Sequence, residues 1–525
     1  MLSGGLQLSD DAPLGLSVGG SKDINIFRQN IRNKYLPVVT DLTYEGLFYD
    51  YFFDTRNSDN NQSVCENLFC PTYSMATVYN NSFSEPNQES CEYYMSVGFS
   101  SNLRTNTFKR NPLNLVIVID VSGSMSASFN RYYYDRPLVN KSNDESRSKI
   151  QITLDVVIKI LNHLKTVDRL AIVTFNTDAK IFQKFIQLKD INIEILKKQL
   201  LKIQADGGTD MSAGICTSES LFTPLLLTDD YDNRIIFLTD AQPNTGQLSE
   251  ESFISNIEQL AHRHIYMTFI GIGIDFNTKL ISLITRQRGA NFFSVSNSKS
   301  FIQLLDTDFD LIITPLVFNL ILKFESNQFE IDHVYGSPEY EQSTNEIMKI
   351  STLFPSRRKD NETRGGIVLI KLKKKKNQSN LNISDIRLTV TYEDRLNKIY
   401  EEKRSVDIIN DQQCSTNYYS NTGIRKGILL INYVTLLKQW IVNERQHNIN
   451  RKPITITFNY IDKKLLFPHT LSEWERQSSP LVVSDIYQQL FKKFLDYFQT
   501  EMLEVNDPDL KQEVDLLKLL IEYKK

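Results

Sequence analysis

Between residues 113 and 295, short and almost uninterrupted apolar runs alternate with amphipathic segments. The runs LNLVIVID, RLAIVTF, RIIFLTD and IYMTFIGIGI have the length and β-branched content of strands buried on both faces. Ile150, Leu154 and Val157 recur at the spacing of one helix face. This rhythm predicts an α/β fold of Rossmann type, with a parallel-dominated sheet covered by helices on both faces.

The sequence on either side of this region has a different pattern. Runs such as FEIDHVYG, GGIVLIKLK and DIRLTVTYED are short strands separated by turn residues, which predicts an antiparallel β-sandwich. The stretch Tyr93–Ser101 alternates in the same way, so the α/β domain is expected to be inserted in the sandwich or followed by it. The predicted organisation is a flexible N-terminus (1–20), a region contributing strands to a β-rich domain (21–111), the α/β domain (112–310), a sandwich-like region (311–410) and C-terminal helices (411–525).

Composition excludes several classes of protein. The 525 residues are 41% hydrophobic and 23% charged, enough for several folded cores. A net charge of −4 argues against a nucleic-acid binder. No apolar run approaches the length of a transmembrane helix, and the first twenty residues lack the basic start and apolar core of a secretory signal, so we expect a cytoplasmic location. The sequence leaves the oligomeric state open.

The five cysteines are Cys65, Cys70, Cys91, Cys216 and Cys414. Their odd number and the size of the chain favour free thiols in a reducing compartment. A structural disulfide among the first three is the alternative, and the spacing of Cys65 and Cys70 does not fit a C-x-x-C zinc site.

Oxygen-bearing side chains stand where the predicted strands end. Asp120, Ser122 and Ser124 follow the first strand, Thr209 lies in the loop DGGTDMS, and Asp240 ends the run RIIFLTD. Because ligands of open parallel sheets bind beyond the carboxyl ends of the strands, we expect these side chains to meet there. Any one segment is also compatible with a helix N-cap, but all three together favour a shared site.

Five oxygen ligands without nitrogen or sulfur suit a hard cation, namely Mg²⁺ or alternatively Mn²⁺ or Ca²⁺. Three of the five are neutral hydroxyls, so the cation would keep positive character and accept a carboxylate from outside. This donor set predicts a metal site that an acidic residue of another protein completes.

The motif D-x-S-x-S, a Thr in a G-G-T-D loop and the Asp of LTD resemble the von Willebrand factor type A (vWA) domain over about residues 112–310. The resemblance implies a metal-ion-dependent adhesion site with Mg²⁺, in which Ser122, Ser124 and Thr209 bind directly and Asp120 and Asp240 bind directly or through water. The segments SGSMSASFNRYYYD and YEGLFYDYFFDT resemble the large vWA proteins labelled calcium-activated chloride channel homologues.

These features predict a non-enzymatic, cation-dependent protein-binding protein of the adhesion or scaffold type. One alternative is a structural metal that only fixes three loops, with partners binding through the sandwich or the helices. A second is a Mg²⁺-dependent enzyme, for which no general base or phosphate-binding loop is visible. A polar insertion at residues 126–148 contains Tyr132, Tyr133 and Tyr134; it is either a disordered loop or a lid that contributes specificity.

Overall fold

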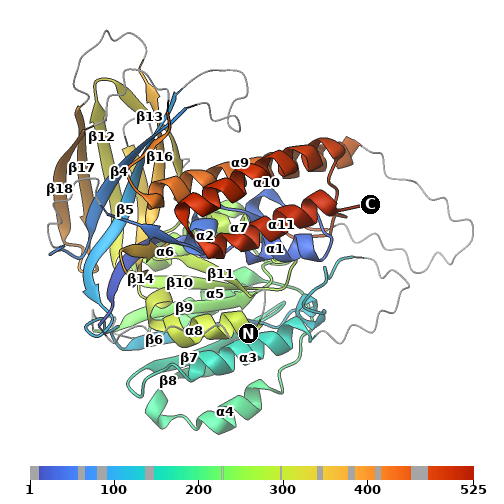
Figure 1. Ribbon diagram of the computed structural model, residues 1–525. Helices are drawn as coiled ribbons and strands as arrows, with labels where there is room; N and C mark the ends of the chain where they lie inside the picture. Colours follow the sequence, from blue (N-terminus) through green and yellow to red (C-terminus); the bar gives the residue numbers. More distant parts are fainter. Residues whose placement is uncertain are drawn as a thin grey trace, which may run out of the picture.

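In the described residues, two β-sheets, the helices that cover one of them and a layer of C-terminal helices make up the fold (Figure 1). The computed structural model describes residues 11–56, 65–79, 91–135, 147–225, 228, 230–295, 298–339, 347–375, 385–407, 416–450 and 471–524. None of the helices in these ranges combines the length and apolar content that a bilayer span needs.

The first sheet has seven strands within these described ranges, in the order β2-β11-β10-β9-β6-β7-β8. Its strands are β2 (Gly20–Ser21), β6 (Leu113–Asp120), β7 (Arg169–Phe175), β8 (Ala179–Gln187), β9 (Asp232–Thr239), β10 (Ile265–Ile272) and β11 (Asn291–Val295). All neighbours are parallel except β7 and β8. This arrangement confirms the predicted parallel-dominated sheet and adds an antiparallel edge strand.

Helices cover both faces of this sheet because successive strand residues point to opposite sides. Leu115 and Ile117 of β6 share a core with α3 (Lys149–Leu161), α4 (Ile193–Leu200) and α8 (Ser298–Ile313). Val116 and Val118 face α5 (Met211–Phe222), α6 (Glu250–His262) and α7 (Thr278–Ile284). Short 3₁₀ turns lie at η1 (Val39–Asp41), η2 (Gly123–Ser126), η3 (Leu188–Asp190) and η5 (Pro508–Leu510).

The second sheet is antiparallel and has twelve strands in the described residues. Its main path is β13 (Phe329–Tyr335), β16 (Ile367–Lys374), β5 (Cys91–Arg104), β1 (Pro13–Val18), β14 (Ile347–Lys359), β12 (Val317–Ser326), β17 (Asp385–Glu393) and β18 (Ile399–Asp407), with β3 (Phe52–Asp54), β4 (Cys70–Tyr79), β15 (Glu362–Arg364) and β19 (Tyr418–Tyr419) off this path. Strands from both sides of the α/β domain pair directly, as in Gly98 with Ile367. The sheet folds over itself, since Phe69 before β4 stacks edge-on against Tyr392 of β17 at 5.4 Å.

The N-terminal segment is more ordered than the sequence indicated. We expected a flexible stretch over 1–20, but Pro13–Val18 is a largely buried strand of the antiparallel sheet. Gly20–Ser21 then adds a short strand to the α/β sheet through β11. The glycines and serines of this stretch hid the strand pattern, and the strands that order it, β5, β11 and β14, lie far along the chain. Residues 1–10 are outside the described chain.

Three C-terminal helices, α9 (Thr422–Asn450), α10 (Asp485–Val505) and α11 (Lys511–Glu522), pack side by side in one layer (Figure 1). Their core also receives α1 (Asn25–Arg32) and α2 (Tyr44–Tyr49). Arg28 of α1 pairs with Asp50 at 2.6 Å and with Glu513 of α11. The N-terminal segment therefore joins the helical layer to the rest of the chain.

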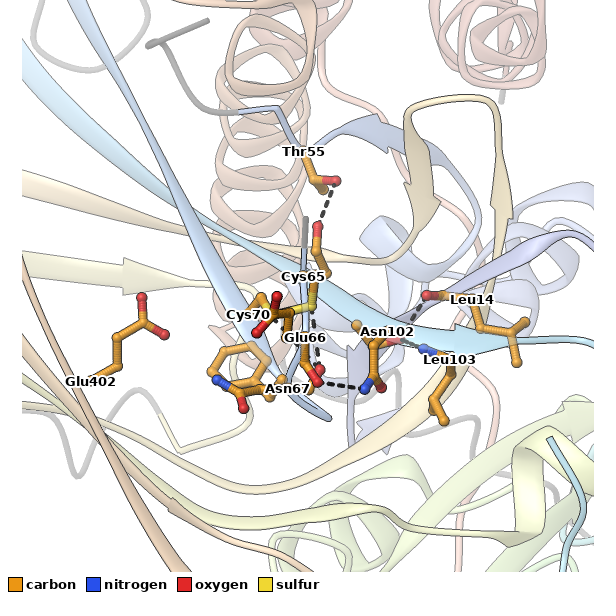
Figure 2. Close-up of a disulfide and its surroundings, with 12 residues drawn as sticks. Leu14, Thr55, Cys65, Glu66, Asn67, Cys70, Asn102, Leu103 and Glu402 are labelled. Atoms are coloured by element: carbon orange, nitrogen blue, oxygen red, sulfur yellow. Dashed lines mark hydrogen bonds between the residues drawn. A yellow bond between two sulfur atoms is a disulfide. The ribbon is translucent and has the colours of Figure 1, made fainter. Parts of the chain in front are cut away.

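The cysteines differ from the favoured expectation. Cys65 and Cys70 form a disulfide with their Cα atoms 5.9 Å apart (Figure 2), and Cys91 is also disulfide-bonded. Among the described cysteines, Cys216 is a free thiol and is exposed. The expectation of free thiols was wrong for Cys65, Cys70 and Cys91. An odd number of cysteines does not exclude disulfides among some of them. Since disulfides persist in oxidising compartments, the expected cytoplasmic location loses its support.

Candidate metal centre

The five oxygen-bearing residues singled out in the sequence lie at the C-terminal edge of the α/β sheet. Asp120 ends β6 and Asp240 directly follows β9, its neighbour in the sheet. Ser122 and Ser124 come from the turn after β6, where their Oγ atoms are 3.1 Å apart. Thr209 lies in the loop before α5. All five are at most 3% exposed, so the structure gathers them beneath the surface of this edge.

Backbone contacts hold the two hydroxyl-bearing loops together. The Ser122 amide donates to Asp120 Oδ1 at 2.9 Å, which closes the turn after β6. The Gly123 amide then donates to the Gly207 carbonyl at 2.9 Å, linking this turn to the loop that carries Thr209. Gly207 has φ +84°, a left-handed conformation that glycine adopts without strain. The glycines of DGGTDMS therefore let the two loops approach.

Asp120 is buried next to a second carboxylate. Its Oδ2 accepts a hydrogen bond of 2.6 Å from the hydroxyl of Thr239. Burial, and then the charge of Asp240, raise the pKa of Asp120 to about 7. Thr239 was missed in the sequence, although it occupies the position before Asp240 in the LTD run. Two carboxylates that disfavour each other's ionisation in this way provide an environment that a cation stabilises.

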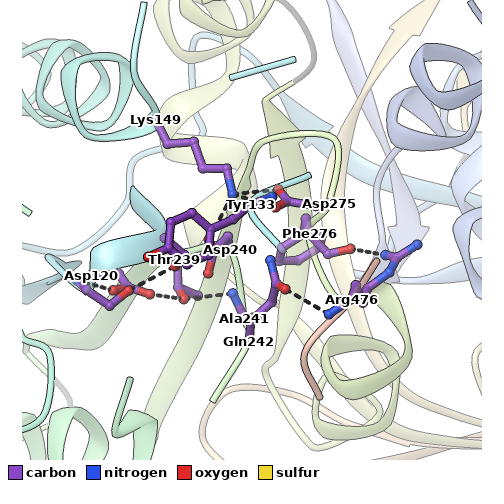
Figure 3. Close-up of polar contacts among 12 residues, drawn as sticks. Asp120, Tyr133, Lys149, Thr239, Asp240, Ala241, Gln242, Asp275, Phe276 and Arg476 are labelled. Carbon is purple, nitrogen blue, oxygen red and sulfur yellow. Dashed lines mark hydrogen bonds and ion pairs between the residues drawn. The ribbon is translucent and has the colours of Figure 1, made fainter. Parts of the chain in front are cut away.

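Lys149 is the main residue that the sequence analysis missed. Its ammonium donates to Asp240 Oδ2 at 2.9 Å and to Asp275 Oδ2 at 2.7 Å, and all three side chains are fully buried (Figure 3). Burial raises the pKa of Asp240, with Lys149 opposing the shift and Asp275 adding to it. A signal was present in the sequence, because Lys149 falls on the same helix face as the apolar Val156 and Ile160.

The charges of this cluster do not cancel. Lys149 pairs with Asp240 and Asp275, whereas the buried carboxylate of Asp120 accepts hydrogen bonds from Thr239 and Ser122, so the buried carboxylates outnumber the ammonium group. Within the described chain, Asp240 Oδ1 is buried and has no hydrogen-bond partner. A hard divalent cation bound among carboxylates and hydroxyls matches both the charge deficit and the oxygen donors. The described residues bring no three His, Cys, Asp or Glu side chains together as a metal site, so such a cation would depend on the hydroxyls.

The tyrosine-rich insertion starts at the rim of this cluster. Tyr133 is 41% exposed, and its hydroxyl lies 3.3 Å from where a Cβ on Gly123 would stand. Tyr134 accepts a hydrogen bond of 3.3 Å from Asn244, whereas Tyr132 is buried and donates to Asn30. The described part of the insertion is therefore anchored beside the site. Residues 136–146 lie outside the described chain, and the lid role stays a prediction.

Comparison with known proteins identifies the α/β domain. Residues 115–242 match the von Willebrand factor type A domain family. Inter-alpha-trypsin inhibitor heavy chain H2 of Mus musculus is 23% identical over 214 residues, which are 40% of this chain and 20% of that protein. Heavy chain H4 of Homo sapiens is 25% identical over 225 residues, 42% of this chain and 22% of that protein. The match thus spans about a fifth of the length of these relatives.

Among solved structures, a von Willebrand factor type A protein from Catenulispora acidiphila aligns with a TM-score of 0.42 and 13% identity, over 72% of this chain and 80% of that one. The wider resemblance to chloride channel homologues stays a prediction. The sheet order and the family match agree with the sequence motifs, and the chain contains a von Willebrand factor type A domain.

Proposed function

We propose that the chain is a non-enzymatic, divalent-cation-dependent protein-binding protein of the adhesion or scaffold type. Its vWA domain would hold Mg²⁺, or Mn²⁺ or Ca²⁺, and a partner's Asp or Glu would complete the coordination. The observation that carries the proposal is the buried cluster of Asp120, Asp240 and Asp275, in which Lys149 pairs with only two of the three carboxylates, beside two serine hydroxyls 3.1 Å apart. Buried charge is costly unless it is paired or bound to a metal.

The roles of the five residues follow from their donors. Ser122, Ser124 and Thr209 would bind the cation directly, and Asp120 and Asp240 would bind it directly or through water. Because most donors are neutral, the bound cation supplies a positively charged position for an outside carboxylate. The residues of this chain exclude solvent beneath it, since both aspartates are fully buried.

The rim of the site supports binding of a protein rather than a small ion alone. Tyr133 presents an exposed aromatic ring next to Gly123, and exposed aromatic side chains are common anchors in protein interfaces. The similar regions belong to proteins named as inhibitor heavy chains, which also favours a binding role. The Cys65–Cys70 disulfide suits an oxidising compartment, where we place the chain.

Thermal unfolding with EDTA, Mg²⁺, Mn²⁺ or Ca²⁺ tests the metal site in wild type and Asp120→Ala. A cation at a hundred times its Kd should stabilise the wild-type fold by about 2.7 kcal/mol. Asp120→Ala should lose this gain. Equal melting with EDTA and Mg²⁺ in the wild type would contradict the proposal.

Partner binding is tested on a peptide array in which one Asp or Glu stands among neutral residues. We expect binding with Mg²⁺, loss with EDTA, and loss in Asp120→Ala. Peptides that bind equally well to Asp120→Ala would instead support a structural metal, with recognition elsewhere on the chain.

A further inference from the structure

A C-terminal segment crosses the loops that carry the candidate metal site. We call residues 471–481 the strap. Trp474 of the strap is fully buried in the core of the sheet face that α5, α6 and α7 cover. The Trp474 indole N–H donates to the Leu248 carbonyl at 2.8 Å, and the Asn277 side chain donates to the Trp474 carbonyl at 2.8 Å. The strap is thus fixed to the loops after β9 and β10.

The far end of the strap is tied to a different part of the chain. Leu36 donates its amide to the Ser479 carbonyl at 2.8 Å, and Leu481 donates to the Lys34 carbonyl at 2.8 Å. Helix α10 starts four residues later, at Asp485. The strap therefore connects the edge of the vWA sheet to the C-terminal helical layer over a short stretch.

One acidic side chain of the strap faces the metal-site loops. Glu475 is 7% exposed, and its Oε1 accepts a hydrogen bond of 3.0 Å from Asn244 Nδ2. Its Oε2 accepts from the Ser472 amide at 2.6 Å within the strap. Both carboxylate oxygens are therefore engaged, and the contact with Asn244 is directed.

Asn244 passes this contact on to Thr209. The side-chain oxygen of Asn244, Oδ1, accepts a hydrogen bond from the Thr209 backbone amide at 2.9 Å. The backbone amide of Asn244 donates to the Thr209 carbonyl at 3.0 Å. An amide side chain has one oxygen acceptor and one nitrogen donor. With its nitrogen donating to Glu475 at 3.0 Å and to Tyr134 at 3.3 Å, Asn244 presents its side-chain oxygen to the Thr209 amide. The backbone amide of Asn244 holds the Thr209 carbonyl, so both sides of that residue are fixed.

The same strap holds the tyrosine-rich insertion. Gln477 donates to the Tyr134 carbonyl at 3.0 Å, and the Ser478 amide donates to Asp135 at 2.9 Å. The neighbouring Arg476 amide donates to Gln242 at 2.9 Å (Figure 3). The insertion, the loop of Thr209 and the loops after β9 and β10 therefore each contact the strap or Asn244.

We propose that Glu475 is a positioning residue for the metal site: through Asn244 it holds Thr209 where its hydroxyl can meet the cation. The inference rests on the proposed function. It implies that the strap couples the C-terminal helical layer to cation affinity, because moving the strap releases Asn244 and the loop of Thr209. Partners that orient metal ligands typically change metal affinity about 10- to 100-fold when removed.

The test is the Mg²⁺ affinity of the full chain, measured by calorimetry with the metal alone. Glu475→Ala should weaken Mg²⁺ binding by about 10-fold or more. Glu475→Gln keeps the shape and one acceptor oxygen, so it should fall between Glu475→Ala and wild type. Glu473→Gln is the matched control, because Glu473 is on the same strap but is 63% exposed and pairs with Lys279 at 3.3 Å.

The outcomes separate the two proposals. A wild-type chain without Mg²⁺ binding would overturn the proposed function. If the wild-type chain and Glu475→Ala bind Mg²⁺ with the same Kd, only the positioning role is overturned. If Glu475→Ala does not fold, Glu475→Gln decides the question. Weakened Mg²⁺ affinity of Glu475→Gln at an unchanged urea midpoint supports the inference. Wild-type Mg²⁺ affinity of Glu475→Gln, together with a crystal structure in which its contact with Asn244 is lost, contradicts it.

Discussion

The ammonium of Lys149 lies 2.9 Å from Asp240 Oδ2, and neither side chain is exposed to solvent. Lys149 stands at the first turn of α3, whereas Asp240 follows β9, ninety-one residues later. The pair therefore ties a helix to the edge of the sheet where the cation is proposed to bind. The positive charge of Lys149 offsets part of the carboxylate charge that would otherwise attract the cation.

Lys149→Met should destabilise the protein most strongly when no divalent cation is present. Removing one partner of a buried ion pair costs about 3–5 kcal/mol, because the other charge stays buried and unpaired. Mg²⁺ should recover part of this loss, so the stabilisation by Mg²⁺ should exceed that of wild type. Urea unfolding with EDTA and with Mg²⁺ measures both quantities.

Lys159→Met is the matched control on the same helix. Lys159 is 27% exposed and pairs with Asp306 at 2.6 Å near the surface. Surface pairs contribute at most about 1 kcal/mol, so this variant should remain close to wild type under both conditions. An equal Mg²⁺ response in Lys149→Met and wild type would show that Lys149 does not share charge with the cation site.

The sequence predicted the parts of the molecule whose signal is local. Buried strands such as Leu113–Asp120 are continuous apolar runs, and the oxygen donors follow them within a few residues. Strand β8 was missed because Ala179–Gln187 is an edge strand in which lysines and glutamines interrupt the apolar residues, and none of its residues is fully buried. No apolar run marks such an edge, so its pairing with β7 becomes visible only in the structure.

The supports of the site were harder to predict for the same reason. Glu475 meets Asn244 across 231 positions, and Lys149 meets Asp275 across 126. Neither contact has a motif, and a charged residue in a polar segment looks like an ordinary surface residue. Only Lys149 left a trace, as a lysine on the apolar face of a helix.

The disulfide predicts a modest contribution to stability. Replacing both Cys65 and Cys70 with Ser should lower the free energy of unfolding by about 2 kcal/mol, because the bond closes only a short loop. Urea unfolding of the oxidised protein measures this. Cys216→Ser is the control and should change stability by less than about 0.5 kcal/mol, since Cys216 is exposed. Recovery of Cys65 and Cys70 as separate, alkylated peptides from the native wild-type protein would contradict the pairing.

Asp23, which lies away from the metal site, should make the stability of the fold depend on pH. Burial raises its pKa from 3.8 to about 6, although the amide and hydroxyl of Ser294 donate to its carboxylate. Between about pH 4 and 6 the folded protein then holds a proton that the unfolded chain has lost, so this group's stabilisation falls as pH rises through that window.

Asp23→Asn should remove this part of the pH dependence. From pH 4 to pH 7, the unfolding free energy of wild type should fall relative to that of Asp23→Asn by at most about 3 kcal/mol. The absolute stability of Asp23→Asn should be lower at acid pH, because its amide nitrogen meets a donor of Ser294. Urea unfolding across this range measures the difference, and parallel pH profiles would contradict the assignment.

Trp474 predicts how firmly the strap is held. Trp474→Ala should cost about 3–5 kcal/mol, as for other large buried side chains, and should release the strap. Trp474→Phe keeps most of the apolar contact and loses the hydrogen bond to Leu248, a loss of about 1 kcal/mol. Native-state trypsin digestion reports release at Arg476, which in the folded chain is tied to Asp41 and the Phe276 carbonyl. We expect rapid cleavage there in Trp474→Ala and slow cleavage in Trp474→Phe and wild type; cleavage at equal rates in all three would mean that contacts other than the indole hold the strap in place.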